Sequence, residues 1–383
     1  MEFELNRIQK GIQKAATDFA KGEFDKDLAM EMDRNQRFPM DLFKKAADLG
    51  FIGIHFDEEV MGGGLGHLET VLTAEALCRR DSTIGSALML AGYGAECLMN
   101  TGSRELKEAF LPHLAEGRML AGAQVPSTNR DTRPLAETLA AEKIHGEWVI
   151  NGTVKDVING QTAGFYCVLC RTDSDASPDK AYSLFLVERD MEGISVSESI
   201  SSFGIRMTSI ADLRFSNVRL PELNLIGKAG NGLKQQASFI NQSRVLMAAM
   251  ALGIGQGALD RSITYVKSRE QFGQKIGRFQ VNAHKVAEMM LGIEQARSLT
   301  YQAAWHLNQK KPDLKLMAMA KLAAIKAALE ASHEAIQLHG GSGFCTEAEV
   351  ERYCRDAKAL EMLGGSTNAL KNDIAAGIIG NIK

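Results

Sequence analysis

Arginine and glutamine side chains flank a short turn in the second half of the chain. Arg269–Gly273, which includes Gln271 and Phe272, is followed by Phe279 and Gln280. A guanidinium group offers a fixed fork of N–H donors, and such a fork beside a helix-associated turn suits an anionic phosphate. An exposed arginine in a polar turn is the alternative interpretation. The segment alone predicts either a phosphate site or an ordinary surface turn.

A glycine-rich segment, Gln337–Phe344, follows about 60 residues later. Gly340 and Gly341 have no side chain beyond Cα, so a ligand can approach their backbone closely. Glycines that end a helix would have the same appearance. This segment therefore indicates a phosphate site only when it is taken together with the arginine turn.

Metal-binding patterns are weak in this chain. Cys167 and Cys170 have C-x-x-C spacing, but they fall on a predicted strand, where residues three apart face opposite sides. His284, His306 and His333 lie on predicted helices without a second ligand four residues later. We predict no metal site.

Length and composition exclude several classes of protein. With 383 residues, 45% hydrophobic and 24% charged, the chain is typical of folded globular proteins of two to three domains. A net charge of −3 argues against a nucleic-acid partner. No apolar run is long enough to span a membrane, the first residues are acidic, and six scattered cysteines suggest no disulfide framework. We therefore predict a cytoplasmic protein.

The pattern of apolar residues divides the chain into three parts. Up to residue 119 it is helical, and the clearest helices are expected at Asp41–Leu49, Leu68–Arg80 and Arg104–Ala115. Short β-rich runs follow, with strands expected at Trp148–Asn151, Phe165–Cys170, Tyr182–Val187, Ile194–Val196 and Asp212–Phe215. Long periodic stretches then return at Gln235–Lys267, Gln280–Asn308, Leu314–His339 and Glu347–Arg355.

These stretches predict an α+β protein with domains at 1–119, 120–228 and 229–383. The first is a helical domain, the second a β-barrel or β-sandwich domain, and the third a C-terminal four-helix bundle. No βαβ alternation or dinucleotide glycine fingerprint is present, so a Rossmann fold is excluded.

At this point the chain resembles the acyl-CoA dehydrogenase family of flavoproteins over essentially its full length. The two segments above resemble that family's R-x-x-F-G…Q and Q-x-x-G-G-x-G motifs, and Arg355–Ala357 resembles its R-D-A signature. In the middle region, Val149–Gly152 and Phe203–Arg206 also match the family pattern.

The resemblance implies FAD as cofactor and an acyl-CoA thioester as substrate. FAD would contact two segments of a neighbouring subunit, at the arginine turn and the glycine-rich segment, and hydroxyl groups of its own subunit. The implied FAD-binding residues are Arg269, Gln271, Phe272, Phe279, Gln280, Gln337, Gly340, Gly341, Ser366, Thr367, Asn368 and Gln124. Asn241 and Arg244 are implied at the acyl-CoA channel.

The carboxylate that removes the α-proton in this family is missing from both of its usual positions. One position follows the R-D-A signature and is occupied here by Gly364; the other precedes the arginine that corresponds to Arg244 and is occupied by Ser243. Neither a glycine nor a serine without an adjacent base takes a proton efficiently. The catalytic residue is therefore unknown.

The segments that contact the flavin ring also depart from the family. The T-E-P-x-x-G-S-D loop corresponds to Gln124–Asp131, and the W-I-T strand to Asp156–Ile158. Asp156 thus replaces the tryptophan that stacks on the flavin, and Ile158 replaces the threonine that donates a hydroxyl hydrogen bond. A negative charge near the ring would disfavour its reduction.

Two hypotheses explain why the phosphate-binding motifs are present while the base and the flavin-ring motifs are not. In the first, the protein is an FAD-dependent oxidoreductase of the CH–CH group of an acyl-CoA, and Asp156, Glu96 or Glu361 replaces the base. A variant of this hypothesis is a non-oxidative lyase or decarboxylase-like enzyme that needs no such base. In the second, it is a degenerate subunit or scaffold paired with a complete acyl-CoA dehydrogenase. The resemblance further implies a homotetramer, or a heteromer with a related dehydrogenase subunit, and an electron-transfer flavoprotein as redox partner.

Overall fold

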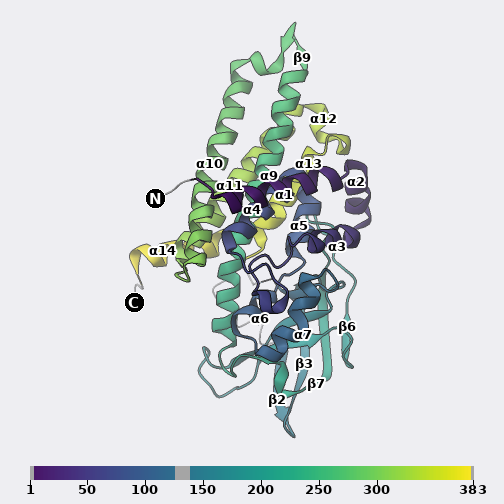
Figure 1. Ribbon diagram of the computed structural model, residues 1–383, viewed down its shortest axis with the longest axis vertical. Helices are drawn as coiled ribbons and strands as arrows, with labels where there is room; N and C mark the ends of the chain where they lie inside the picture. The colour runs from purple at the N-terminus through teal and green to yellow at the C-terminus, as the bar shows by residue number, and fades with distance from the viewer. Residues whose placement is uncertain (1–3, 126–138, 381–383) are drawn as a thin grey trace.

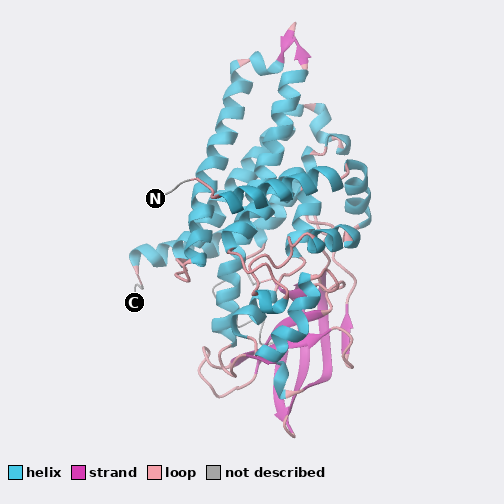
Figure 2. Cartoon of the chain, viewed as in Figure 1, coloured by secondary structure: helices cyan, strands magenta, loops and turns pink. Residues whose placement is uncertain are grey.

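The computed structural model describes residues 4–125 and 139–380. Figures 1 and 2 show long helices at one end of the molecule, strands at the other end, and short N-terminal helices between them. This arrangement confirms the predicted α+β class, with helical, β and helical regions in chain order.

The N-terminal region consists of seven helices. They are α1 (Arg7–Glu23), α2 (Lys26–Asn35), α3 (Met40–Asp48), α4 (His67–Arg80), α5 (Ser82–Leu90), α6 (Ala95–Thr101) and α7 (Arg104–Ala115). Asp81 separates α4 from α5, because its carboxylate accepts hydrogen bonds from the N–H groups of Thr83 and Ile84 and so caps the second helix. All nine residues of α5 are buried, which makes this helix part of the core.

The middle region is an eight-stranded sheet. Its strands are β1 (Ala121–Gln124), β2 (Leu139–Ile144), β3 (Glu147–Ile158), β4 (Phe165–Arg171), β5 (Tyr182–Glu188), β6 (Ile194–Val196), β7 (Ile210–Leu220) and β8 (Leu225–Ile226). The strands follow the order β6-β7-β3-β1-β4-β5-β8, and β2 pairs with both β3 and β4. Because β1 also lies between β3 and β4, these four strands close on one another, as in a small barrel.

The C-terminal region is built around α9 (Gly232–Ser268), which packs against α4, α10 (Gln280–Asn308) and α11 (Leu314–His339). A small hairpin of β9 (Glu270–Gln271) and β10 (Gln274–Lys275) links α9 to α10 and forms the tip of the molecule in Figure 1. The chain ends with α12 (Gly341–Phe344), α13 (Val350–Met362) and α14 (Thr367–Ile379). Helix α9 therefore packs among helices of both the N-terminal and the C-terminal region.

The helix expected at Glu347–Arg355 begins later than its apolar pattern suggested. Residues Thr346–Ala348 form a 3-10 turn, and Glu349 adopts a left-handed backbone with φ of 63°. The following helix, α13, therefore runs over Val350–Met362. The difference arises because periodicity locates a helix but does not locate the turn that precedes it.

Asp356 joins the three regions of the fold. Its buried carboxylate accepts hydrogen bonds from Ser82 Oγ (2.6 Å), Thr83 Oγ1 (2.7 Å) and the backbone N–H of Ile205 (2.6 Å). The neighbouring Arg355 forms an ion pair of 2.9 Å with Asp33 on α2. In this chain, the R-D-A signature fixes α13 against the helical and β regions.

Across residues 4–125 and 139–380, none of the helices combines the length and apolar character needed to span a lipid bilayer.

Candidate active site

A cavity lies between the N-terminal helices and α9. Its lining comes from the loop before α4, from α4 to α7 with the turn between α5 and α6, and from α9. The residues include Phe51, Ile54, Phe56, Val71, Leu88, Met89, Leu114, Phe239, Val245 and Leu246, with His55, His67, Thr70, Tyr93, Glu96, Gln242 and Ser243 as polar members. The cavity volume is about 80 Å³, whereas one water-sized group needs roughly 10–15 Å³. A short chain of several atoms would fit.

The two positions at which the sequence predicts a missing base, Ser243 and Gly364, lie next to each other. Ser243 lines the cavity from α9, and Gly364 lies in the loop between α13 and α14. A Cβ atom at Gly364 would be 3.4 Å from Ser243 Oγ and 3.6 Å from Met247 Cγ. Carboxylate side chains placed at either position would therefore reach the same region of the protein.

Arg244 holds the loop that contains Gly364. Its guanidinium donates hydrogen bonds to the carbonyl oxygen of Gly364 (3.2 Å), to Asn241 Oδ1 (2.8 Å) and to Asp373 Oδ2 (2.7 Å). The arginine is only 5% exposed. Arg244 and Asn241, which sequence predicts at the substrate channel, thus bind each other, and Arg244 also fixes the loop.

Lys321 supports the same loop from α11. This lysine is fully buried, and its ammonium donates hydrogen bonds to the carbonyl oxygens of Leu363 and Gly365. Burial, aided by the nearby guanidinium of Arg244, lowers the pKa of Lys321 to about 7. Both cations thus hold residues 363–365 through backbone carbonyls.

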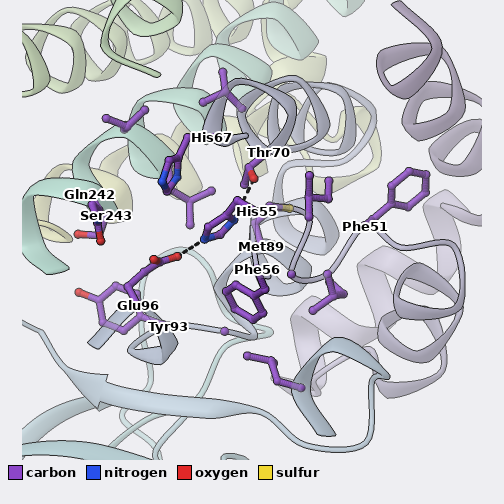
Figure 3. Close-up of a pocket in the computed structure, with 18 of the residues that line it drawn as sticks. Phe51, His55, Phe56, His67, Thr70, Met89, Tyr93, Glu96, Gln242 and Ser243 are labelled. Atoms are coloured by element: carbon purple, nitrogen blue, oxygen red, sulfur yellow. Dashed lines mark hydrogen bonds and ion pairs between the residues drawn. The ribbon is translucent and has the colours of Figure 1, made fainter. Parts of the chain in front are cut away.

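A histidine–glutamate pair forms the polar part of the cavity (Figure 3). His55 Nε2 binds Glu96 Oε1, and His55 Nδ1 lies 3.1 Å from Thr70 Oγ1. The ring of His67 packs against the ring of His55, with 4.6 Å between their centroids. Tyr93 also lines the cavity.

Burial and charge act in opposite directions on this pair. Burial would lower the pKa of His55, but the Glu96 carboxylate outweighs it, so the pKa is raised. Burial would likewise raise the pKa of Glu96, but His55 outweighs it and the pKa is lowered. The pair is therefore charged near neutral pH. Burial and the neighbouring His55 lower the pKa of His67 to about 4, so its imidazole is neutral.

The three carboxylates considered as replacement bases lie in different places. Glu96 lines the cavity that contains Ser243. Glu361 lies on α13, where it accepts a hydrogen bond from Thr367 Oγ1 (2.9 Å) and pairs with Lys358. Asp156 is exposed on β3, at a register irregularity where its φ is 55°.

The residues expected at the FAD phosphates gather at the ends of α9 and α11. Arg269, Gln271, Phe272 and Gln280 are exposed around the β9–β10 hairpin, and Phe279 is half-buried with its ring 6.3 Å from that of Phe272. Gln337, Gly340 and Gly341 are exposed at the end of α11. The two groups lie on adjacent helices, because the rings of Tyr265 on α9 and His339 on α11 stack with 4.3 Å between centroids.

The remaining expected FAD residues lie elsewhere in the chain. Ser366 caps α14, with Thr367 half-buried and Asn368 exposed beside it. In Figure 1, α14 lies far from the hairpin tip. Gln124 ends β1, where it pairs with Val157 of β3. The rest of the loop expected against the flavin ring, residues 126–131, lies outside the described residues.

Sequence reasoning missed several polar groups of the site. His55, His67 and Tyr93 carry no motif, and Lys321 lies within an ordinary amphipathic helix. One signal was available for His55, since it is the only polar residue in the run Phe51–Phe56. A polar residue inside an apolar run is a candidate for a buried interaction.

The sequence of the chain matches known families over nearly its whole length. Three segments match the families described as Acyl-CoA dehydrogenase, N-terminal domain (residues 6–118), middle domain (126–218) and C-terminal domain (230–379). The probable acyl-CoA dehydrogenase YngJ of Bacillus subtilis is 34% identical, and the alignment covers 98% of this chain and 99% of that protein.

Two solved structures share the whole fold. Butyryl-CoA dehydrogenase from Megasphaera elsdenii has a TM-score of 0.93 at 29% identity and covers 99% of this chain and 100% of its own. A chain from work on the electron transferring flavoprotein of Acidaminococcus fermentans has a TM-score of 0.94 at 31% identity, with full coverage of both chains. Helices, sheet and bundle in this order define the class of acyl-CoA dehydrogenase-like proteins. The chain belongs to the acyl-CoA dehydrogenase family.

Proposed function

We propose that this protein is an FAD-dependent oxidoreductase that acts on the CH–CH group of an acyl-CoA thioester. The observation that carries the proposal is the meeting of Ser243 and Gly364 beside an apolar cavity. In the family, the reacting carbons lie beside the carboxylate at one of these positions. The cavity then receives the acyl chain that extends beyond them.

The residues at the end of the bundle suit the diphosphate of FAD. Arg269 supplies an exposed guanidinium, and Gln337 supplies an amide. Gly340 and Gly341 have open space where a Cβ would stand, and Gly340 has a φ of 58°. Donors beside an unobstructed backbone fit an anionic group. When bound, FAD supplies the acceptor for the hydride that leaves the β-carbon.

The proposed FAD site needs two copies of a chain. Within one chain, the hairpin residues and the Ser366–Asn368 segment lie apart, although the family brings both types of residue to FAD. A second subunit would bring the missing set. We propose a homotetramer, or a heteromer with a related dehydrogenase subunit, in the cytoplasm, with an electron-transfer flavoprotein as redox partner.

Without the family's carboxylate, the residues of this chain can hold the substrate site in shape but offer no good base for the α-proton. Arg244 and Lys321 hold the 363–365 loop, so the site keeps its shape without a carboxylate. Glu96 is paired with His55 and has a lowered pKa, which makes it a poor base for an α-proton. Desaturation would therefore be slow, and a reaction on the acyl chain that needs no base is the alternative chemistry.

The test begins with the visible spectrum of the purified protein after incubation with FAD and desalting. We expect about one FAD per chain. The double variant Arg269→Ala/Gln337→Ala should lose most of this flavin, because it removes a cation and an amide from the diphosphate. The control Arg104→Ala/Gln309→Ala removes the same two side-chain types on α7 and at the end of α10, and it should retain FAD.

The outcomes separate the hypotheses. Retention of FAD by the double variant would reject these residues as the phosphate site. Absence of flavin in the wild-type protein would reject the enzyme and favour a degenerate subunit, and a partner dehydrogenase chain should then be sought by co-purification. Perturbation of bound flavin by butyryl-CoA would support the thioester substrate.

A further inference from the structure

Three ionisable side chains lie together in the wall of the cavity beside Ser243. His55 Nε2 binds Glu96 Oε1, and the ring of His67 packs against the ring of His55 with 4.6 Å between their centroids. All three residues line the cavity, whose wall is otherwise mostly apolar. A plain hydrocarbon ligand would shield these polar groups from water without offering them a partner, which costs free energy. The cluster therefore favours a ligand that carries a polar group.

His67 is the member of this cluster whose ring can still form hydrogen bonds. Both ring nitrogens of His55 are engaged, because Nε2 binds Glu96 and Nδ1 lies 3.1 Å from Thr70 Oγ1. The backbone N–H of His67 donates to Asn308 Oδ1 (2.6 Å), but its ring nitrogens have no hydrogen bond within the described part of the chain. Figure 3 shows this ring projecting from α4 beside the pair. A group that enters the cavity is therefore the expected partner of the His67 ring.

The ionisable groups of the cavity wall carry no net charge near neutral pH. The raised pKa of His55 and the lowered pKa of Glu96 keep the pair charged, so the two charges cancel. The imidazole of His67 is neutral, because burial and the neighbouring His55 lower its pKa to about 4. Burial raises the pKa of Tyr93, a further residue of the wall, and keeps its hydroxyl neutral. A neutral polar group suits this wall, since the charges of His55 and Glu96 already neutralise each other.

We propose that His67 binds a hydroxyl group on a short acyl chain of the substrate, and that the ring of His55, fixed by Glu96 and Thr70, supports His67 for this contact. This inference rests on the proposed function, because it assumes that the acyl chain occupies this cavity. A neutral imidazole has one nitrogen that donates a hydrogen bond and one that accepts. A hydroxyl group both donates and accepts, so it pairs with whichever nitrogen faces the cavity. A methyl group in its place would leave the ring unpaired.

The size of the cavity favours a short acyl group. At about 80 Å³, it holds only a few atoms beyond the thioester. The matched probes are butyryl-CoA and 3-hydroxypropionyl-CoA, which differ only in a terminal methyl or hydroxyl group. Two charged probes, 3-aminopropionyl-CoA with an ammonium and malonyl-CoA with a carboxylate, test whether the site prefers a neutral group.

The experiment measures the dissociation constant of each thioester by titration calorimetry with the FAD-loaded protein. We expect 3-hydroxypropionyl-CoA to bind about tenfold more tightly than butyryl-CoA, the factor that one hydrogen bond of ordinary strength supplies. It should also bind more tightly than both charged probes. Equal or tighter binding of butyryl-CoA, or of either charged probe, would overturn the inference while leaving the thioester function intact. Failure of every thioester to bind would instead contradict the proposed function.

Variants of His67 link the preference to this residue. His67→Phe and the smaller His67→Leu remove both ring nitrogens, so in either variant the preference for the hydroxyl probe should fall below about threefold. His67→Gln keeps a donor and an acceptor and should retain more of the preference than the apolar variants do. The control His306→Phe replaces a histidine at the end of α10 whose Nδ1 lies 3.3 Å from the carbonyl oxygen of Lys311, and it should keep the full preference. An unchanged preference in a folded apolar variant would overturn the assignment to His67.

Discussion

Gly364 and Ser243 face each other across 3.4 Å, measured from a Cβ placed on the glycine to the serine Oγ. They come from positions more than 100 residues apart, yet both are the positions at which the sequence predicts that the family's base is missing. The loop that contains Gly364 is held by Arg244 and Lys321 through its carbonyl oxygens. The two predicted base positions thus lie side by side in a loop and helix held together by two cations, and neither position carries a carboxylate.

Ser243→Glu should create or raise desaturation of butyryl-CoA. Ser243 lies within α9 and borders the cavity, so a glutamate there needs no unusual backbone conformation. Burial would raise the pKa of this new carboxylate and make it a better base. We expect at least a tenfold gain in the rate of flavin bleaching by butyryl-CoA under anaerobic conditions.

Ser243→Gln is the matched control, because it has the same shape without the charge, and it should show no gain. Gly364→Glu offers the same base from the loop, but Gly364 has a φ of 67°. A side chain in that conformation costs about 1–2 kcal/mol. Equal activity of the glutamate and glutamine variants would mean that the flavin environment, and not the missing carboxylate, limits the reaction.

Asp356→Asn should destabilise the whole fold by about 2–4 kcal/mol, because it removes the charge that accepts three hydrogen bonds and turns an NH₂ group toward a donor. Urea unfolding measures this change. Ser82→Ala removes only one of the three donors and should cost about 1 kcal/mol. Similar losses for both variants would argue that Asp356 does not join the regions.

The long helices could be predicted because their apolar residues repeat regularly and polar residues mark their ends. Gln280–Asn308 and Leu314–His339 match the structure at both ends. By contrast, α5 (Ser82–Leu90) gave no periodic signal, since it is buried on every side. The apolar periodicity of a helix reveals which of its faces is buried. It gives no signal when every face of the helix is buried.

The site was predictable only where motifs mark it. Arg269 and Gln337 were found because their segments resemble two motifs of the family, and their role toward FAD stays a prediction. His55 and Glu96 are 41 residues apart and meet only because the loop before α4 folds against α6. Lys321 is likewise indistinguishable in sequence from Lys326, the exposed lysine of the same helix. Interactions between distant segments are set by tertiary packing, which local patterns do not contain.

The His55–Glu96 pair should stabilise the protein most between about pH 4.5 and 6.5. The raised pKa of His55 gives stability that is complete below its ordinary value of 6.5 and is lost as pH rises through the folded value. The lowered pKa of Glu96 gives stability that is complete above 4.5 and is lost as pH falls. His55→Gln should therefore cost about 3 kcal/mol within this window and less above it.

Unfolding by urea at several pH values measures this dependence. His284→Gln, an exposed histidine on α10, is the control and should change stability little at any pH. A cost of His55→Gln that does not vary between pH 5.5 and 8.5 would show that packing, rather than charge, explains the contribution of His55.

Lys321 predicts a pH dependence of opposite sign. Burial lowers its pKa from 10.5 to about 7 in the folded protein, so between these values the unfolded chain binds a proton that the folded chain does not. Stability therefore rises with pH in this range. A shift of this size contributes about 2 kcal/mol between pH 7 and 9.

Lys321→Met should remove this increase, because methionine fills a similar volume without a titrating group. The measured quantity is the change in unfolding free energy from pH 7 to 9, compared between wild type and variant. Lys326→Met replaces a lysine on the same helix whose side chain is 74% exposed, and it should keep the wild-type slope. If Lys321→Met also keeps that slope, the ammonium stays charged while buried, and its hydrogen bonds to the carbonyls of Leu363 and Gly365 compensate for its lost hydration.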